Sequence, residues 1–312
     1  MHQRLPEPPD PAEQSAAATW APLRAFIAGE ARLGAAFAAR GPVAAGVYEF
    51  LRFGVKQGWA CLFGGIFVGL ILATWLWYPR GAALSRYDFL FLAALVIQGA
   101  LLALRLETFE EAKVIFTYHV VGTVMEIFKT GVGSWIYPEP SFFRIGGVPL
   151  FAGFMYACVG SYICRSWRLF HFRFVRHPPL GALGLLSLAI YANFFAHHFL
   201  PDMRLVLFAA ALVLFGRARL YFLVWHTPRW MPLIVGLSLV AVFIWIAENV
   251  GTFTRTWSYP AQREAWVLVG WQKLGSWLLL LIISYTLVAF IKRADIKPPE
   301  ASATAPPAPP AG

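Results

Sequence analysis

The sequence predicts an all-α protein: a polytopic membrane bundle of about eight transmembrane helices, arranged as two parallel four-helix repeats. Three observations predict it. First, apolar residues make up 59% of the 312 residues, charged residues make up 13%, and the mean hydropathy is +0.60. Soluble domains are about 45–50% apolar and about 25% charged. Second, apolar runs long enough to cross a bilayer follow one another along the chain. Third, one motif occurs twice at a fixed offset.

The two ends of the chain lack the pattern of a folded core. Residues 1–18 are rich in Pro, Glu and Ala, and residues 293–312 are rich in Pro and Ala, so we expect both tails to be disordered. Residues 19–56 carry short apolar groups between arginines, with a break at Gly41-Pro42. This pattern predicts an amphipathic segment at the membrane interface. No apolar core of a cleavable signal peptide precedes it, so the first span is expected to act as an uncleaved insertion signal.

Residues 57–292 form the expected transmembrane domain. The third apolar run contains Tyr118, His119 and Glu126, so we expect it inside the bundle rather than against lipid. Lys and Arg near the span ends are more frequent on the side that shares the N-terminus, which favours two cytoplasmic termini and fits a bacterial inner membrane. The expected spans cover about 59–78, 87–104, 114–128, 148–164, 180–200, 205–220, 232–250 and 266–291.

A motif of Glu, eight residues, Trp, one residue and Tyr-Pro occurs at Glu126–Pro138 and again at Glu248–Pro260. The matched positions share an offset of 122 residues (126 to 248), which Pro79 and Pro201 also keep. We interpret this as an internal duplication, with repeat one at about 57–165 and repeat two at about 178–292. Four spans per repeat return the chain in the same orientation, so a pseudo-two-fold axis along the membrane normal is expected.

The two motif glutamates are the first candidates for a functional site. An ionisable residue at the edge of a span is costly and suggests a function, and the duplication would turn Glu126 and Glu248 toward a common space. His119 lies two helical turns before Glu126 on the same face, and His197 is expected at the same depth. We therefore predict Glu126, Glu248, His119 and His197 as catalytic acid–base residues. Alternatively, the glutamates are structural hydrogen-bond acceptors and the histidines are buried core residues.

Polar and aromatic side chains at the same depth are the candidates for ligand binding. The motif aromatics could instead belong to the interfacial aromatic belt, and Lys273 could extend to the interface or neutralise a glutamate. No helix carries a His-x-x-His or His-Glu-x-x-His pair, so we predict no metal site, and no cofactor is indicated. The predicted ligand-binding residues are Trp135, Tyr137, Trp257, Tyr259, Asn193, Asn249 and Lys273.

The same sequence argues against several functional classes. The net charge of +10 sits in short loops between apolar runs, where it anchors the topology and does not form a nucleic-acid-binding face. The three cysteines lie in apolar or membrane-end sequence without metal-ligand spacing and are expected to be packing residues. We find no phosphate-cradling Gly-rich loop, no Gly-x-Ser-x-Gly turn and no Asp-rich pair. ATP-driven transport and prenyl transfer are therefore disfavoured.

Seven stretches of the chain resemble one family of bacterial membrane proteins, domain-of-unknown-function family 817, also called YoaT-like. The resemblance covers about residues 47–292. Because no activity is assigned to the family, the resemblance implies a membrane fold and no mechanism. The matching stretches are 53–65, 86–92, 133–140, 144–150, 160–164, 193–198 and 247–253.

Three hypotheses for the function remain open from the sequence. The first is a membrane enzyme or binding protein for a small lipophilic or amphipathic molecule, with an outward-facing site around Glu126 and Glu248. The second is a small-solute transporter with parallel repeats. The third is a structural or partner-binding membrane protein in which the two motifs brace the halves. The bilayer is the expected partner in all three, without nucleic acid.

Overall fold

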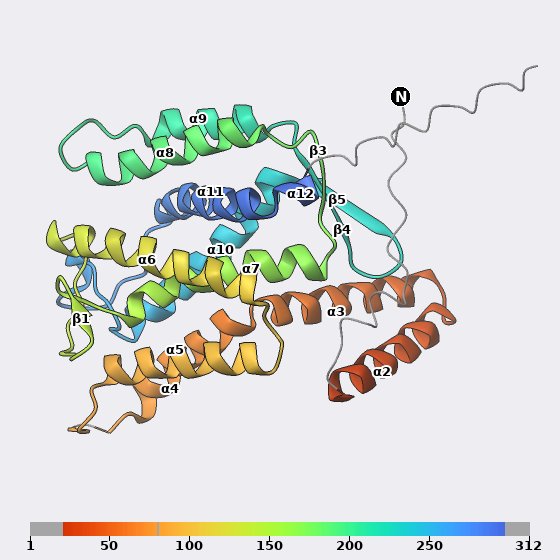
Figure 1. Ribbon diagram of the computed structural model, residues 1–312, viewed down its shortest axis with the longest axis horizontal. Coiled ribbons are helices and arrows are strands. Elements are labelled where there is room, and N and C mark those ends of the chain that lie inside the picture. The colour runs from red at the N-terminus through yellow and green to blue at the C-terminus, as the bar shows by residue number, and fades with distance from the viewer. Residues whose placement is uncertain (1–20, 80, 297–312) are drawn as a thin grey trace, which may run out of the picture.

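Helices dominate the computed structural model, which describes residues 21–79 and 81–296. Most of them run lengthwise along the molecule (Figure 1). A three-stranded sheet lies at one end, called here the sheet end. The loops that carry the two motif copies, residues 132–138 and 254–260, lie at the opposite end, called here the motif end. The predicted disordered tails, 1–18 and most of 293–312, lie outside the described residues.

The segment expected at the interface forms two helices. Helix α2 spans Ala21–Ala38 and α3 spans Pro42–Ala60, separated at Gly41, whose φ of 109° favours glycine. Pro42 then occupies the first turn of α3, where no backbone N–H is needed. Helix α3 leads through Cys61 into α4, Leu62–Trp77, with a bend of 71°.

The next three helices surround the first motif copy. Helix α5 spans Arg86–Ala103, α6 spans Phe109–Gly131 and α7 spans Phe151–Leu169, with the short hairpin β1, Arg144–Ile145, and β2, Val148–Pro149, before α7. A capping box of Thr108 and Glu111 begins α6. The other helices are α8 Leu180–Ala196, α9 Arg204–Phe215, α10 Leu233–Phe253, the 3-10 turn η1 Pro260–Gln262, α11 Lys273–Ile291 and α12 Arg293–Ile296.

The antiparallel sheet at the sheet end differs from the sequence prediction. Its strands β3, Arg173–Val175, β4, Arg219–Leu223, and β5, Pro228–Pro232, are ordered β3-β4-β5. The sixth apolar run was expected to continue as a helix to residue 220, but α9 ends at Phe215 and the chain pairs with its neighbours instead. A short apolar run fits either a helix or a strand, and here the partner strand decides.

Three helices among the described residues, α5, α10 and α11, are long and apolar enough to cross a membrane. The bent pair α3 and α4 makes a fourth if it counts as one span. Large apolar side chains on these and neighbouring helices face outward, including Val96, Val213 and Leu185, which are 71%, 85% and 70% exposed. These features indicate a membrane protein. The helices of the other expected spans do not meet this criterion: α8 and α9 are too short, and α6 and α7 carry charged residues that lower their hydropathy.

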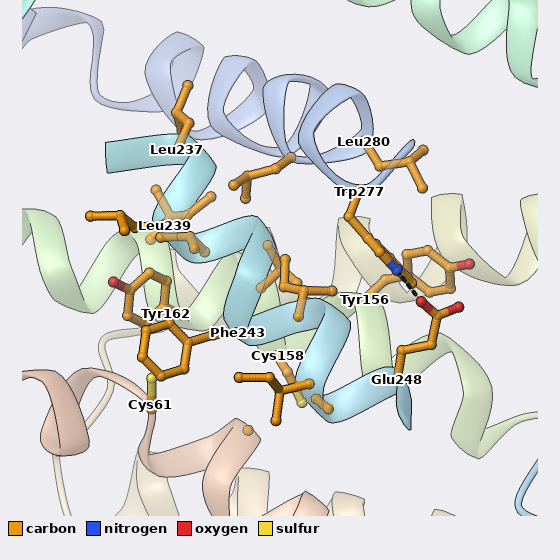
Figure 2. A pocket seen from close by; sticks show the side chains of 18 of the residues that line it. Cys61, Tyr156, Cys158, Tyr162, Leu237, Leu239, Phe243, Glu248, Trp277 and Leu280 are labelled. Atoms are coloured by element: carbon orange, nitrogen blue, oxygen red, sulfur yellow. Dashed lines mark hydrogen bonds between the residues drawn. The ribbon is translucent and has the colours of Figure 1, made fainter. Parts of the chain in front are cut away.

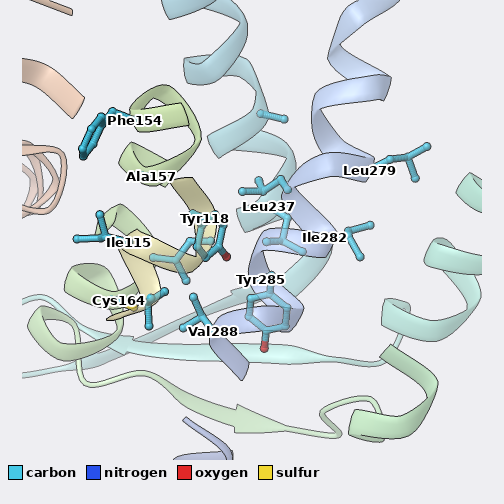
Figure 3. Close-up of a cluster of buried hydrophobic side chains, with 14 of the residues drawn as sticks. Ile115, Tyr118, Phe154, Ala157, Cys164, Leu237, Leu279, Ile282, Tyr285 and Val288 are labelled. Carbon is cyan, nitrogen blue, oxygen red and sulfur yellow. The ribbon is translucent and has the colours of Figure 1, made fainter. Parts of the chain in front are cut away.

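The apolar core lies where α6, α7 and α11 meet, with Leu237 of α10 against it (Figure 3). Helix α7 is the most central, with buried residues along most of its length. The expectation that the third run lies inside the bundle holds for one face of α6 only. Its other face presents an apolar stripe of Phe116, Val120 and Val124 outward, and these side chains are 68%, 46% and 50% exposed.

Helix α7 also extends beyond the expected span and carries a buried ion pair. The fourth span was expected to end at about residue 164, but α7 continues to Leu169, and Arg165 within it is only 1% exposed. Its Nε lies 3.4 Å from Oε1 of Glu107, which also accepts a hydrogen bond of 2.6 Å from Ser161 Oγ. These contacts join α7 to the turn after α5.

Candidate functional site

The two motif loops meet at the motif end of the bundle. Ile136 and Ser258, the middle residues of the two Trp-x-Tyr segments, form an isolated antiparallel bridge. Each backbone N–H donates to the carbonyl oxygen of the other residue at 3.0 Å. The two glutamates, one at the end of each preceding helix, are thereby brought to the same region.

The Glu126 carboxylate lies near the end of α6 and is only 3% exposed. Its Oε2 accepts hydrogen bonds from Trp135 Nε1 and Tyr137 OH, each at 2.7 Å. Its Oε1 accepts a third, also at 2.7 Å, from Tyr156 OH of α7. Both carboxylate oxygens are therefore occupied by neutral donors from the motif loop and the next helix.

Glu248 of α10 repeats this arrangement with one change. It is 3% exposed, its Oε1 accepts from Tyr259 OH, and its Oε2 accepts from Trp277 Nε1 of α11 (Figure 2). Trp257 does not bond to the carboxylate, because its ring lies directly over Gly251 of α10. In each copy, the helix that follows the motif loop supplies one aromatic donor.

The loop tyrosines remain donors over the physiological pH range. Burial raises the pKa of Tyr137 and of Tyr259 well above its ordinary value, and the neighbouring carboxylate raises it further. The phenols therefore stay protonated and donate to the glutamates. Carboxylates held by this many donors are fixed in position, which favours a bracing role over that of a mobile acid or base.

The start of α5 fixes both motif loops from the side. Tyr87 OH donates to the carbonyl oxygen of Thr256 at 2.8 Å, and Arg86 pairs with Glu139 at 2.7 Å. The Asp88 carboxylate accepts two backbone N–H bonds of 2.8 Å from residues 142 and 143, just beyond the first loop. These contacts hold the loops over the bundle and leave a hollow beneath them.

A cavity of about 1120 Å³ extends from the motif loops along α10 toward the sheet end. Side chains of α3, α4, α7 and α11 form its other walls. Figure 2 shows Glu248, Trp277 and Tyr156 together, while Leu237, Leu239 and Phe243 mark the apolar part. All the Asp, Glu, Lys and Arg residues in its lining lie at the motif end: Glu126, Lys129, Arg204, Glu248 and Lys273.

Most of the predicted site residues line this cavity, but two do not. His119 packs against Phe154 of α7 with ring centroids 4.5 Å apart, beside Gly153 and away from the cavity lining. Asn249 donates to the carbonyl oxygen of Trp245 and accepts from the Val269 N–H, both at 2.9 Å, so it holds the segment before α11. The predicted residues in the lining are Glu126, Glu248, His197, Trp135, Tyr137, Trp257, Tyr259, Asn193 and Lys273.

The sequence did not single out several side chains that belong to the site. Tyr156 and Trp277 lie 30 and 29 residues after their glutamates, and this nearly equal spacing is a signal that could have found them. Lys129 and Arg204 were counted only as topology-setting charges. Within the described residues, no group of three or more His, Cys, Asp and Glu side chains is placed to hold a metal ion.

Comparison with known proteins places the chain in a family. The sequence profile of the family described as protein of unknown function (DUF817) matches residues 49–285, which include both motif copies and the charged end of the cavity. The uncharacterized protein YoaT of Bacillus subtilis (strain 168) is 39% identical over 254 residues, covering 81% of this chain and 95% of that protein. No solved structure matches the chain significantly. The chain therefore belongs to the DUF817 family.

Proposed function

We propose that this membrane protein binds a small amphipathic molecule in the cavity beneath the motif loops, at a site built around Glu126 and Glu248. The cavity itself carries the proposal. Its volume of about 1120 Å³ is at or above the usual range of about 300–1,000 Å³ for small-molecule sites. Its long apolar wall ends in a compact group of charged and aromatic side chains, which suits a molecule with one polar end.

Within this function, the two glutamates act first as braces. Their hydrogen bonds to Trp and Tyr hold the motif loops at a fixed height above α7 and α11. Loss of either carboxylate would let its loop collapse into the cavity or move away from it. His197 also lines the cavity, with its ring beside that of His198.

The proposal includes an architecture of two parallel four-helix repeats across the membrane, with α7 shielded by the other spans and the apolar stripe of α6 turned toward lipid. Helices α7 and α11 support it, since both their first and last residues differ by the motif offset of 122 (151 to 273 and 169 to 291). Neighbour relations recur as well: α4 packs on α7 as α8 packs on α11, and α6 packs on α7 as α10 packs on α11. The motif end would then lie on the extracytoplasmic side of the membrane, with both termini cytoplasmic.

Two glycines of α4 provide a matched test of the cavity. Gly65 lines the cavity, whereas Gly69, one turn further along, does not, and an added Cβ would meet no atom within 4 Å at either position. Gly65→Phe should place a ring inside the cavity, in the path of a bound molecule, and Gly69→Phe should place the same ring outside it. We expect the wild type and Gly69→Phe to carry a lipophilic molecule through purification in mild detergent, detected by mass spectrometry of the organic extract.

The Gly65→Phe variant should lose that molecule at unchanged thermal stability. Equal occupancy in both glycine variants, or a wild-type extract that contains nothing beyond bulk lipid and detergent, would contradict the proposal.

Transport is the second candidate, and the length of the cavity favours it. Both Leu233 and Val250 of α10 line the cavity, a separation of about 26 Å at 1.5 Å per residue, which approaches the hydrocarbon thickness of about 30 Å. Movement of the bound molecule between the leaflets of reconstituted vesicles, blocked by Gly65→Phe, would support transport. Binding without any such movement would leave the protein a binding protein.

A further inference from the structure

Three cations reach the motif end of the cavity from three different helices. Lys129 comes from the last turn of α6, Arg204 from the first position of α9 and Lys273 from the first position of α11, and all three line the cavity. The positive charges of Lys273 and Arg204 act on Lys129, and the charge of Arg204 also acts on Lys273. Like charges repel, and an anion between them would offset this repulsion.

The two lysines have no anionic partner of their own. Lys129 is 3% exposed, and its Nζ lies 2.8 Å from His198 Nε2, 3.5 Å from His197 Nε2 and 4.1 Å from the ring centroid of Phe194. Lys273 Nζ lies 4.2 Å from the ring centroid of Tyr259. In the part of the chain that the structure describes, neither ammonium takes part in an ion pair.

The histidine beside Lys129 cannot balance its charge, because an imidazole is either neutral or positively charged near neutral pH. Burial, the Lys129 ammonium and the neighbouring His197 all lower the pKa of His198 below its ordinary value. The ring is therefore a neutral acceptor for the Lys129 ammonium.

The nearby carboxylates are already engaged. Glu126 and Glu248 accept hydrogen bonds from Trp and Tyr donors, and Asp202 bonds to the side chain and the backbone N–H of Arg204. Glu248 attracts Lys273 at a distance without forming an ion pair with it. A buried ammonium surrounded by imidazole and aromatic rings is costly. The arrangement is favourable once an anion enters between Lys129 and Lys273.

The rest of the cavity is apolar, so it would favour an anion that carries an apolar tail. Beyond the motif end its wall includes Met155, Val159, Leu237, Val240 and Phe243, which we call the apolar trough, and no charged side chain lines it. A lipid tail that reaches halfway across the hydrocarbon layer is about 15 Å long. The trough along α10 is long enough to hold such a tail. A free inorganic anion would leave the trough empty.

We propose that the bound molecule is an amphiphile with an anionic head group, a carboxylate or a phosphate, held by Lys129 and Lys273 with its tail in the apolar trough. This inference rests on the proposed binding function and names the chemical class of its ligand. Arg204 is already paired with Asp202 and adds positive potential to the site. Its guanidinium also donates a hydrogen bond of 3.2 Å to Ser276 Oγ at the rim of the cavity.

The test compares two probes with the same tail and different heads. The full chain, purified in nonionic detergent, is titrated with hexadecanoate and with hexadecan-1-ol, and bound molecules are counted by native mass spectrometry. Wild type should bind the acid about tenfold or more tightly than the alcohol, since each charge-assisted hydrogen bond contributes about tenfold to hundredfold. Lys273→Met should lose most of this preference while still binding the alcohol. Lys273→Arg should keep the preference, and so should Lys292→Met, which removes a lysine at the far end of α11.

The possible failures are distinguishable. If wild type binds the acid and the alcohol equally, and Gly65→Phe blocks both, the anionic head group is wrong while the binding function stands. If neither probe binds, or Gly65→Phe has no effect, the binding function itself is wrong. If inorganic phosphate alone binds as tightly as hexadecanoate and displaces it, the site is one for a free anion and the amphiphile is overturned.

Discussion

At the scale of single residues, Glu126 and Glu248 each gather aromatic donors that are far apart in sequence. Glu126 joins the first motif loop to α7, and Glu248 joins the second motif loop to α11. The hydrogen bonds are buried or partly buried, so each donor would lose its protein partner if the carboxylate were removed. An unpaired buried donor costs about 1–3 kcal/mol. The glutamates therefore contribute to stability whatever the ligand is.

The first prediction concerns Glu126→Ala. Three buried donors lose their acceptor at once, so we expect the free energy of unfolding to fall by about 3–5 kcal/mol. Glu126→Gln, which keeps one carbonyl oxygen as an acceptor, should lose clearly less. The measurement is chemical unfolding in detergent micelles followed by tryptophan fluorescence. Glu264→Ala, at an exposed loop position, serves as the control and should be unchanged. A Glu126→Ala variant as stable as this control would refute the bracing role.

At the scale of elements, the end of α10 is shaped by the close approach of the second motif loop. Gly251 lies one turn after Glu248, and the Trp257 ring occupies the space where a side chain would begin. A Cβ at position 251 would lie 1.9 Å from Cη2 of Trp257. The absence of a side chain therefore lets the chain turn back over its own helix and bring Tyr259 to Glu248.

The second prediction is that Gly251→Ala destabilises the motif end. The added methyl group cannot fit unless Trp257 moves, and overpacking of this kind costs about 1–3 kcal/mol. Gly99→Ala in α5 is the matched control, because no atom lies within 4 Å of its added Cβ, and replacing a mid-helix glycine with alanine should stabilise by about 0.5–1 kcal/mol. Thermal unfolding of both variants in one detergent is the measurement. Shifts in the same direction would contradict the close packing of Trp257.

At the scale of the whole molecule, the two motif loops join the first and second halves of the chain. The Ile136–Ser258 bridge pairs residues that differ by 122 positions, the same offset as the two glutamates. A contact between equivalent positions is the pattern that a two-fold axis produces at an interface between like halves. The cavity lies beneath this contact, and both halves contribute to its walls.

The third prediction tests the contact between the halves with a disulfide. Directly opposite, hydrogen-bonded residues of an antiparallel pair have Cα atoms about 5.5 Å apart, which suits a disulfide. In a chain with Cys61, Cys158 and Cys164 replaced by Ala, Ile136→Cys with Ser258→Cys should crosslink readily under mild oxidation. Mass spectrometry of the linked peptides reports the bond. The control pairs Ile136→Cys with Arg263→Cys, and equal crosslinking in the two would count against the bridge.

Composition and hydropathy predicted the membrane character and the helical class, and the repeated motif drew attention to the two glutamates. These follow from composition and from the motif residues themselves, since a buried Glu flanked by Trp and Tyr must find partners nearby. Glu126 and Glu248 lie at one end of the bundle as predicted, with both Tyr137 and Tyr259 as donors. Each of the eight expected spans overlaps one helix of the series α4 to α11, although only up to four spans among the described residues pass by length and composition.

Which side chains share the cavity could not be predicted from the sequence. His119 and Glu126 lie on the same helix at a spacing that suggests one face, yet His119 turns against Phe154 while Glu126 reaches the motif loop. Lys129 and Lys273 line the same cavity although they lie on helices from different halves. The reason is physical: helical periodicity fixes which residues of one helix share a face, but the rotation of that face toward a neighbour is set by packing between helices. Close approaches such as Trp257 over Gly251 depend on contacts that no local pattern encodes.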